Sequence, residues 1–284
     1  RLDHRGRDPL LPARPPSARW RPHARGGMLP EMKPQTLLLV LSSFALVACE
    51  GQRYHVHAGP VSARARGEVA LPNAGGSLTL GANQNSIDGD LGVGDEEVSP
   101  YLRASTDIDR HRVRADGFWL DAEGNGTLGG DYGGLAAGSL VSTTLDFYAV
   151  GLSYAYQLVR EEHFRFAGGA KVGFYSLDVT ARSAVGQEEV VTEVFVPMPY
   201  IEAEAFFGPV TLGANAAIMA ADLGDADGRY WDLEGYASWR IGDDFDVKAG
   251  YRYLLLDGAG RASSRDFDAD VDVQGVFVSA GVRF

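Results

Sequence analysis

From residue 75 to residue 284 the chain alternates apolar and polar side chains with a period of two, over ten successive segments. In the last segment Val276, Val278 and Val282 share one face, whereas Ser279 and Arg283 share the other. This period is typical of β-strands whose two faces meet different surroundings. No segment of helix length with a 3.6-residue period interrupts the alternation, so the pattern predicts an all-β fold.

The ten expected strands are joined by connections of two kinds. The strands cover residues 76–83, 97–105, 110–120, 138–158, 163–180, 194–207, 209–221, 229–240, 244–257 and 271–284. Short connections at 106–109, 159–162, 208 and 241–243 alternate with mostly longer ones at 84–96, 121–137, 181–193, 222–228 and 258–270. Short turns at one end and long loops at the other are typical of outer-membrane barrels. We therefore predict a single closed antiparallel up-and-down transmembrane β-barrel of ten strands, with eight as the alternative.

The residues before the barrel divide into three segments. Residues 1–27 are rich in Arg and Pro and lack hydrophobic periodicity, so they are interpreted as an extension upstream of a start at Met28 or Met32. Residues 28–48 contain Lys33 and the apolar run 36–47, which is too short to cross a bilayer of about 30 Å as a helix. Residues 49–74 are expected to form a periplasmic tether, and residues 75–284 the barrel.

Cys49 follows the apolar run after one residue, Ala48, and is the only cysteine of the chain. The small residue before it predicts a lipoprotein-type signal peptide, with Cys49 as the lipidation site. The alternative is an ordinary signal peptide whose cleavage site falls near Cys49 by coincidence. A single cysteine excludes a disulfide framework.

The exported part of the chain is strongly acidic. When the eight Lys and Arg and three Asp and Glu of residues 1–48 are set aside, 18 Lys and Arg remain against 35 Asp and Glu. Nucleic-acid binding depends on cations that neutralise phosphates, so this charge excludes a nucleic-acid partner.

Alternation alone does not say which face of the barrel meets lipid, because a soluble barrel fills its interior with the apolar face. The export signal and the aromatic residues near both ends of the apolar faces favour an apolar outer face. Trp231 and Trp239 are eight residues apart, which is about 20 Å along the membrane normal for a strand tilted near 40°. The predicted membrane girdle consists of Trp231, Trp239, Tyr251, Tyr253 and Phe284. A soluble ligand-carrying barrel is the alternative.

The opposite faces place charges of both signs inside the barrel. The predicted ion-pair network consists of Arg103, Arg112, Arg114, Arg165, Lys171, Glu202, Glu204, Asp232, Glu234, Asp246, Lys248 and Arg252. Asp116, Arg240 and Arg283 are expected on the same faces. Charges in a narrow interior must be paired or hydrated, and barrels of eight to ten strands leave little room beyond their side chains. The sequence therefore predicts a largely closed lumen.

The chain resembles the small bacterial outer-membrane β-barrel proteins, the superfamily of the outer-membrane protein A transmembrane barrel. The resemblance rests on the terminal strand VFVSAGVRF with Phe284, on the motifs YAYQL and AGYRYLLLDG, and on the alternation of turns and loops over residues 75–284. It implies recognition of the terminal strand by the barrel-assembly machinery and contact with outer-membrane lipids and lipopolysaccharide. A monomer is expected. Ten strands and the lipoprotein signal depart from the best-known members.

Few residues of the chain suggest chemistry. His55 and His57 fall in the expected tether, and His111 and His163 follow short turns without a Ser at useful spacing, whereas a general base needs hydrogen-bond reach to its proton. Glu202 and Glu204 resemble a catalytic carboxylate pair, but they more simply pair with Lys171 or Arg165. The sequence predicts no enzyme, no catalytic residue and no cofactor.

Acidic residues gather in the expected loops, at Asp88, Asp90, Asp95, Glu96 and Glu97, at Asp222, Asp225 and Asp227, and at Asp266, Asp268, Asp270 and Asp272. Two interpretations are divalent cations that bridge the loops to lipopolysaccharide phosphates, and a solvated negative surface. No segment has the spacing of a calcium loop, so no metal site is predicted. The expected function is a structural or surface-interaction barrel. The alternatives are a small gated channel or transporter, or an outer-membrane lipid-modifying enzyme.

Overall fold

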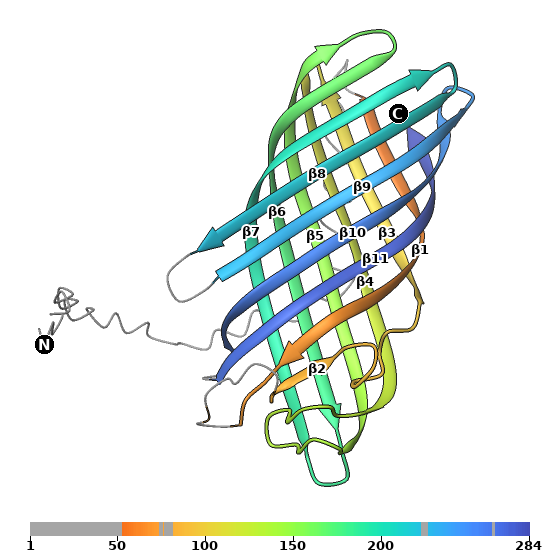
Figure 1. Cartoon of the computed structure of the whole chain (residues 1–284). Helices are drawn as coiled ribbons and strands as arrows, with labels where there is room; N and C mark the ends of the chain where they lie inside the picture. Colours follow the sequence, from red (N-terminus) through yellow and green to blue (C-terminus); the bar gives the residue numbers. More distant parts are fainter. Residues whose placement is uncertain (1–52, 74–75, 77–81, 223–226, 263–264) are drawn as a thin grey trace, which may run out of the picture. The chain divides into compact units, whose positions relative to one another are not determined.

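Ten long strands and one short strand account for almost all of the ordered architecture (Figure 1). The computed structural model describes residues 53–73, 76, 82–222, 227–262 and 265–284. The strands are β1 (Arg53–Ala70), β2 (Gln84–Ser86), β3 (Glu97–Ile108), β4 (His111–Thr127), β5 (Leu140–Arg160), β6 (Phe164–Arg182), β7 (Gln187–Phe207), β8 (Val210–Asp222), β9 (Asp227–Ile241), β10 (Phe245–Ala262) and β11 (Arg265–Arg283). Within the described ranges no helix has the length and apolarity needed to cross a bilayer.

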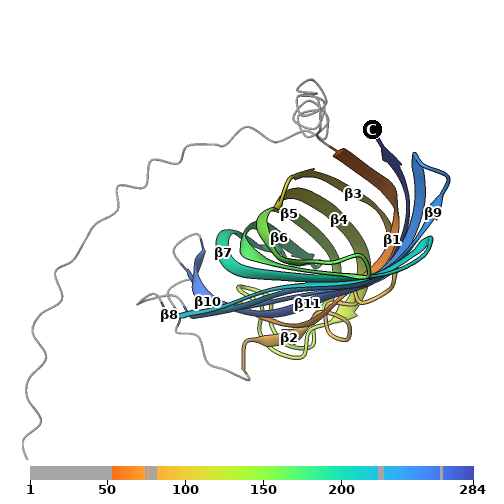
Figure 2. The same cartoon turned by 90° about the horizontal axis from the view of Figure 1, so that it is seen from above.

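The strands form a closed antiparallel barrel, as the alternation predicts. Each long strand pairs with its neighbours in chain order, β1 pairs with β3, and β11 returns to pair with β1, which closes the ring. Seen from above, β3 to β6 form one side of the ring and β8 to β11 the other (Figure 2). The prediction of an all-β barrel of ten strands is confirmed, and β2 is a short addition to the edge of β1.

The barrel begins earlier than the sequence predicts. Residues 53–70, expected in a periplasmic tether, form the closing strand β1, and His55 and His57 therefore lie in the barrel wall. The expected first strand at 76–83 is not a barrel strand: residues 77–81 lie outside the described residues, and Asn83 lies in a bend. Towards its loop end β1 carries small residues inside, such as Ala63 and Ala65, and charged residues outside, so it resembles a polar linker.

Both ends of the barrel chain meet at the end of the short turns. The backbone N–H of Tyr54 donates to the carbonyl of Phe284 at 2.9 Å, and the N–H of Phe284 donates to the carbonyl of Tyr54 at 3.1 Å. The two aromatic rings stack with their centroids 5.8 Å apart. We call this end of the barrel the turn end and the opposite end, which carries β2, the loop end. The upstream segments 1–27 and 28–48 and Cys49 lie outside the described residues.

The strands run further than predicted at the loop end. β6 continues to Arg182 and β7 begins at Gln187, so most of the expected loop 181–193 is a strand hairpin. The expected loops 121–137 and 258–270 are likewise shortened by β4, β10 and β11. The short turns fall where the sequence places them, since β3–β4, β5–β6, β7–β8 and β9–β10 are joined by connections of two or three residues.

Strand β5 keeps the same face outward along its length. Its register with β4 is continuous, and its register with β6 shifts only between Gln157 and Val159. Asp146 therefore lies on the outer face and pairs with Asp121 on one side and Asp178 on the other. Burial and these two neighbouring carboxylates raise the pKa of Asp146. Three adjacent carboxylates belong in water, so a lipid-facing part of β5 would start past them, near Tyr148.

The interior consists of two layers of different chemistry. Towards the turn end the inner side chains are charged, and towards the loop end they are apolar, with residues such as Leu120, Leu145 and Val179 at zero exposure. The expectation of a polar interior is therefore wrong for the loop-end half. Side chains from segments outside the barrel strands complete this apolar layer, namely Leu71, Ile87, Leu91, Val93, Leu128, Tyr132 and Leu135.

Backbone hydrogen bonds hold these segments inside the loop end. The N–H of Ile87 donates to the carbonyl of Gly67 in β1 at 2.9 Å, and the N–H of Gly133 donates to the carbonyl of Leu71 at 2.8 Å. The amide oxygen of Asn85, which is fully buried, accepts from the N–H of Gly130 at 3.1 Å. Segments 82–93 and 128–138 thus form a plug that packs onto the apolar layer.

Candidate functional site: the charged interior

The inner wall of the turn-end half carries the ion-pair network that the sequence predicts. Among the residues of that network, Arg165 is partly exposed and the others are buried. Asp116 is buried with them, and Arg283 is partly exposed. Arg240 pairs with Asp246 and keeps the inward parity of β9, but it is exposed because it lies at the turn end. Alternation along each strand was enough to place these side chains, because inner and outer faces exchange at every residue.

A central cluster joins four strands across the interior. Lys171 of β6 lies 2.6 Å from a carboxylate oxygen of Asp232 in β9 and 3.2 Å from one of Asp116 in β4. Arg252 of β10 reaches the same two carboxylates at 2.9 Å and 2.6 Å. The two cations and two carboxylates balance, so the cluster satisfies buried charge without water.

Beside the central cluster, Arg103 of β3 binds Glu234 of β9 through both guanidinium Nη atoms, with Nη1–Oε1 at 2.5 Å. The Tyr101 hydroxyl donates to Glu234 at 3.2 Å, and the Asn215 amide contacts it at 3.4 Å. A fork-to-fork pair fixes the orientation of both side chains. This pair spans the barrel from one wall to the other.

A rim cluster lies closer to the turn end. Its cations and carboxylates are Arg112, Arg114, Arg165, Asp107, Glu202 and Glu204. Arg112 links three carboxylates, with distances of 2.6 Å to Asp107 and 3.0 Å to both Glu202 and Glu204. Asp107 is not predicted from the sequence because it falls in the expected turn 106–109. It has the same parity as Arg103, four residues earlier, and this parity was the signal available.

Lys248 differs from the other inner cations. It is buried, and within the described part of the chain no carboxylate lies within ion-pair distance of it. Its ammonium instead lies 4.4 Å from the centroid of the Tyr236 ring. Nearby, Asp246 accepts a hydrogen bond from Ser238 at 2.8 Å and lies 3.8 Å from His57. Lys248 is thus held by a cation–π contact rather than by a carboxylate.

Glycines on the inner wall make room for the aromatic rings of this layer. Gly213 pairs directly with Tyr236 on β9, and a Cβ on Gly213 would collide with the ring. The ring cannot easily move, because its hydroxyl donates to Glu204 at 2.6 Å and Lys248 lies over its face.

We expect Gly213→Ala to destabilise the barrel by about 1–3 kcal/mol, the usual cost of overpacking a filled interior. The matched control is Gly235→Ala on the neighbouring strand, where a Cβ would meet nothing within 4 Å, and which should change stability by about 0.5 kcal/mol or less. Urea titration of both variants in detergent micelles measures the difference. Equal stabilities would show that Tyr236 does not occupy the space beside Gly213.

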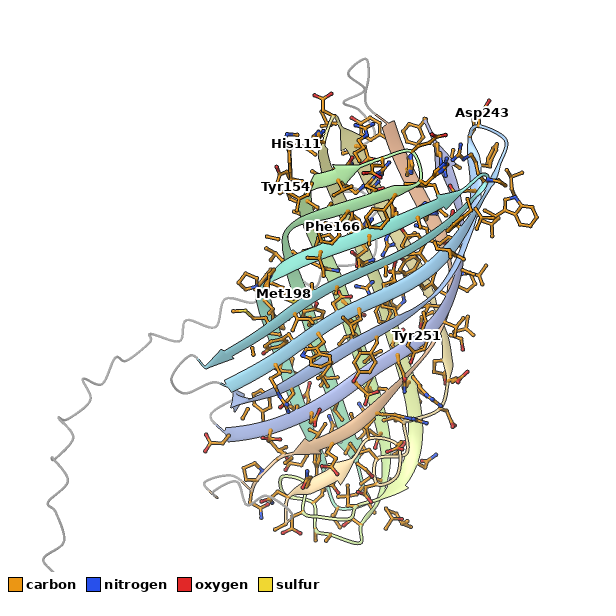
Figure 3. All side chains as sticks on the ribbon, turned by 45° about the horizontal axis from the view of Figure 1, so that its top comes forward. His111, Tyr154, Phe166, Met198, Asp243 and Tyr251 are labelled. Carbon is orange, nitrogen blue, oxygen red and sulfur yellow. The ribbon has the colours of Figure 1, made fainter. Side chains whose placement is uncertain are left out.

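The four histidines among the described residues lie far from the loop end. His55 and His57 belong to the turn-end half of β1, and His111 and His163 lie at the start of β4 and just before β6. His111 contacts the Tyr154 hydroxyl at 2.7 Å. Figure 3 labels both residues, which lie near each other on β4 and β5. Among the described residues no group of three or more His, Cys, Asp or Glu side chains could hold a metal ion.

The acidic residues expected in loops have separate surroundings. Asp90 closes the turn after β2, where it accepts from the backbone N–H of Ser86 at 2.8 Å. Asp268, Asp270 and Asp272 lie within β11 rather than in a loop. Asp225 lies outside the described residues.

The predicted girdle residues face outward. Trp231, Trp239, Tyr251 and Phe284 are exposed, and Tyr253 is half-buried on the same outer face. Further outward aromatic residues, not singled out from the sequence, are Tyr148, Tyr154, Tyr156, Phe195 and Phe207. Exposed apolar residues of this number are typical of a lipid-facing band.

No protein-family model and no curated protein matches the sequence of the chain. Among solved structures, the chain is similar to the outer membrane protease OmpT from Escherichia coli, with 12% identity over 83% of this chain and 96% of that chain and a TM-score of 0.53. Neisserial surface protein A has 14% identity over 83% of this chain and 100% of that chain, with a TM-score of 0.34. Ail of Yersinia pestis, the attachment invasion locus protein, has 11% identity over 82% and 99%, with a TM-score of 0.34. At these identities the likeness concerns the fold alone. The chain therefore has the fold of an outer-membrane β-barrel protein.

Proposed function

We propose that the chain is a non-enzymatic barrel of the bacterial outer membrane that is closed to solutes and serves a structural or surface-interaction role. The observation that supports it is the presence of two barriers in series along the interior. The charged layer fills the turn-end half, and the apolar layer with its plug fills the loop-end half. Outer-membrane lipids and lipopolysaccharide are the proposed partners of the apolar outer band and of the projecting hairpins.

Each barrier opposes a different class of solute. An ion crossing the charged layer would have to break pairs such as Lys171–Asp232, and it would then meet an apolar layer that cannot hydrate it. An apolar solute crossing the plug would meet the charged layer. The two layers together support a closed barrel rather than a channel.

A non-catalytic role is supported by the places of the general-base candidates. Short turns of outer-membrane barrels face the periplasm, so the proposed orientation places the turn end there. The four described histidines lie at this end, away from the cell surface. Glu202 and Glu204 are both engaged by Arg112, and Glu202 also lies 2.8 Å from Arg114. Both carboxylates are thus already engaged by inner cations.

Planar-bilayer recording tests the closed state. We expect no stable conductance from the folded protein, because neither layer leaves a hydrated path. Heat-modifiable migration of the same sample on a gel, a shift between folded and boiled protein, serves as the control for folding. A large and persistent open-channel current would contradict the proposal.

We also propose that Cys49 is acylated and anchors the N-terminus on the periplasmic side. β1 begins at Arg53 at the turn end, only four residues after Cys49, so a lipid there would lie within reach of the inner leaflet. Cells fed a labelled fatty acid should incorporate label into the wild-type chain, and Cys49→Ser should lose all of it. Label that persists in the Cys49→Ser variant would contradict the anchor.

A further inference from the structure

The barrel wall is not hydrogen-bonded along its whole height between β7 and β8. These strands pair from Phe207↔Val210 at the turn to Tyr200↔Ala217, and no further pairs follow. Beyond that point β7 pairs with β6 as far as Gln187, and β8 pairs with β9 as far as Asp222. Figure 1 shows β8 slanting away from the lower course of β7. We call the facing edges, residues 195–199 of β7 and 218–220 of β8, the seam.

Two prolines explain why the ladder ends there. Pro199 immediately follows the last pair, Tyr200↔Ala217, and Pro197 comes two residues further along the same edge. Proline has no N–H to donate to a ladder and is confined to the edges of sheets. The prolines also reduce the number of unsatisfied donors, which are costly in hydrocarbon.

The seam lies at the level of the bilayer. On β7 the outer face is apolar from Phe207 to Phe195 and becomes acidic at Glu193. The side chain of Phe195 is 69% exposed and that of Ile218 is 43% exposed on the outer face. In the orientation of the proposed function the loop end faces the cell exterior, so the seam falls in the outer leaflet.

The inner side of the seam is apolar as well. Val194, next to the seam on β7, and Met219, within it on β8, are half-buried and pack against the buried core of the apolar layer. Val196 and Met198, next along β7, belong to that core, and Figure 3 labels Met198 on this wall. Neither edge carries a charged residue between 194 and 200 or between 216 and 220. An occupant of the seam must therefore be apolar along its length.

We propose that the seam admits an acyl chain of an outer-leaflet lipid, which lies between β7 and β8 and contacts the apolar layer through Val194 and Met219. A lipid chain matches the apolar surface on both sides and is present at this depth of the membrane. A strand from a second copy fits less well, because Pro197 and Pro199 cannot donate to an added ladder.

Quenching of tryptophan by lipids with brominated acyl chains tests the proposal. The full chain, with its four tryptophans changed to Phe, carries a single new tryptophan by Met219→Trp and is placed in brominated phospholipid vesicles. The matched control is Phe277→Trp, an inner and fully buried position on β11 that is paired on both sides with β1 and β10. We expect strong quenching at residue 219 and little at residue 277.

A second variant distinguishes an acyl chain that lies between β7 and β8 from one that lies only near the outer face of the seam. Pro197→Val with Pro199→Val restores two N–H donors, and the ladder should then extend and reduce quenching at residue 219 to the level of residue 277. Absence of quenching at residue 219 overturns the proposal, whether or not the barrel dimerises. Quenching that is unchanged in the proline variant also overturns it. Heat-modifiable migration checks the folding of every variant, and bilayer recording tests the closed state separately.

Discussion

Arg252→Met should destabilise the folded barrel by about 3–5 kcal/mol, the usual cost of removing one partner from a buried ion pair. Arg252 lies 2.6 Å from Asp116 and 2.9 Å from Asp232, and its side chain is 5% exposed. Its loss leaves two buried carboxylates with Lys171 as their single close cation. Methionine keeps much of the volume, so the loss of charge dominates. Urea titration in detergent micelles, followed by tryptophan fluorescence, measures the change.

Lys248→Met is the matched control, because it removes a buried cation from the same strand, four residues away. Lys248 contacts the Tyr236 ring but no carboxylate at ion-pair distance among the described residues. We expect its removal to change stability by about 1 kcal/mol or less in either direction. Equal losses for the two variants would mean that the interior responds to total charge and not to particular pairs.

The location of inner charges could be predicted from the sequence, whereas their partners could not. Alternation fixes the face of each residue, and the near balance of signs indicates pairing. However, Arg103 on β3 binds Glu234 on β9, and Lys171 on β6 binds Asp232 on β9. These strands are not neighbours, so no local spacing predicts the contacts. Only the closure and stagger of the barrel bring them together.

The sequence does not predict the apolar layer, because both faces of the strands are apolar there and the alternation of apolar and polar residues is lost. On β5, Leu145 and Phe147 face inward, while Tyr148 and Val150 face outward in the adjoining segment, so both faces are apolar there. A polar interior was inferred from the strands that alternate cleanly, such as β9. The sequence does not predict the plug either, because Ile87 and Leu91 lie in an expected loop and their burial depends on tertiary contacts.

The sequence does not predict β1 as a barrel strand, because the turn-end and loop-end halves of β1 differ. Inner residues Ala63 and Ala65 are small, as the plug requires, and outer residues Arg64 and Arg66 extend beyond the lipid band. Neither half has the bulky apolar face that marks the other strands. The sequence therefore indicates a linker at these residues, although the fourteen residue pairs between β1 and β11 close the barrel.

Strand β5 provides a test of whether the outer apolar face of the barrel meets lipid. On β5, Leu152 faces outward at 51% exposure within the apolar band, and Thr144 faces outward in the part that projects beyond it. Leu152→Arg should cost about 2–4 kcal/mol in lipid vesicles, because arginine near the bilayer centre loses its hydration. Thr144→Arg should cost about 0.5 kcal/mol or less, since its side chain lies in water.

A third variant on β5 distinguishes the barrel interior from the two outer environments, lipid and water. Leu145, one residue from Thr144, faces inward with zero exposure, so Leu145→Asp should bury an unpaired carboxylate and cost several kcal/mol in lipid and in detergent alike. The cost of Leu152→Arg, in contrast, depends on the bilayer, and it should decrease when thin or short-chain lipids bring water closer to residue 152. A protein with a soluble outer surface would tolerate arginine at residues 144 and 152 equally, whatever the lipid. Unfolding titrations of the three variants in bilayers of two thicknesses therefore discriminate a membrane barrel from a soluble one by the ratio of the two arginine costs.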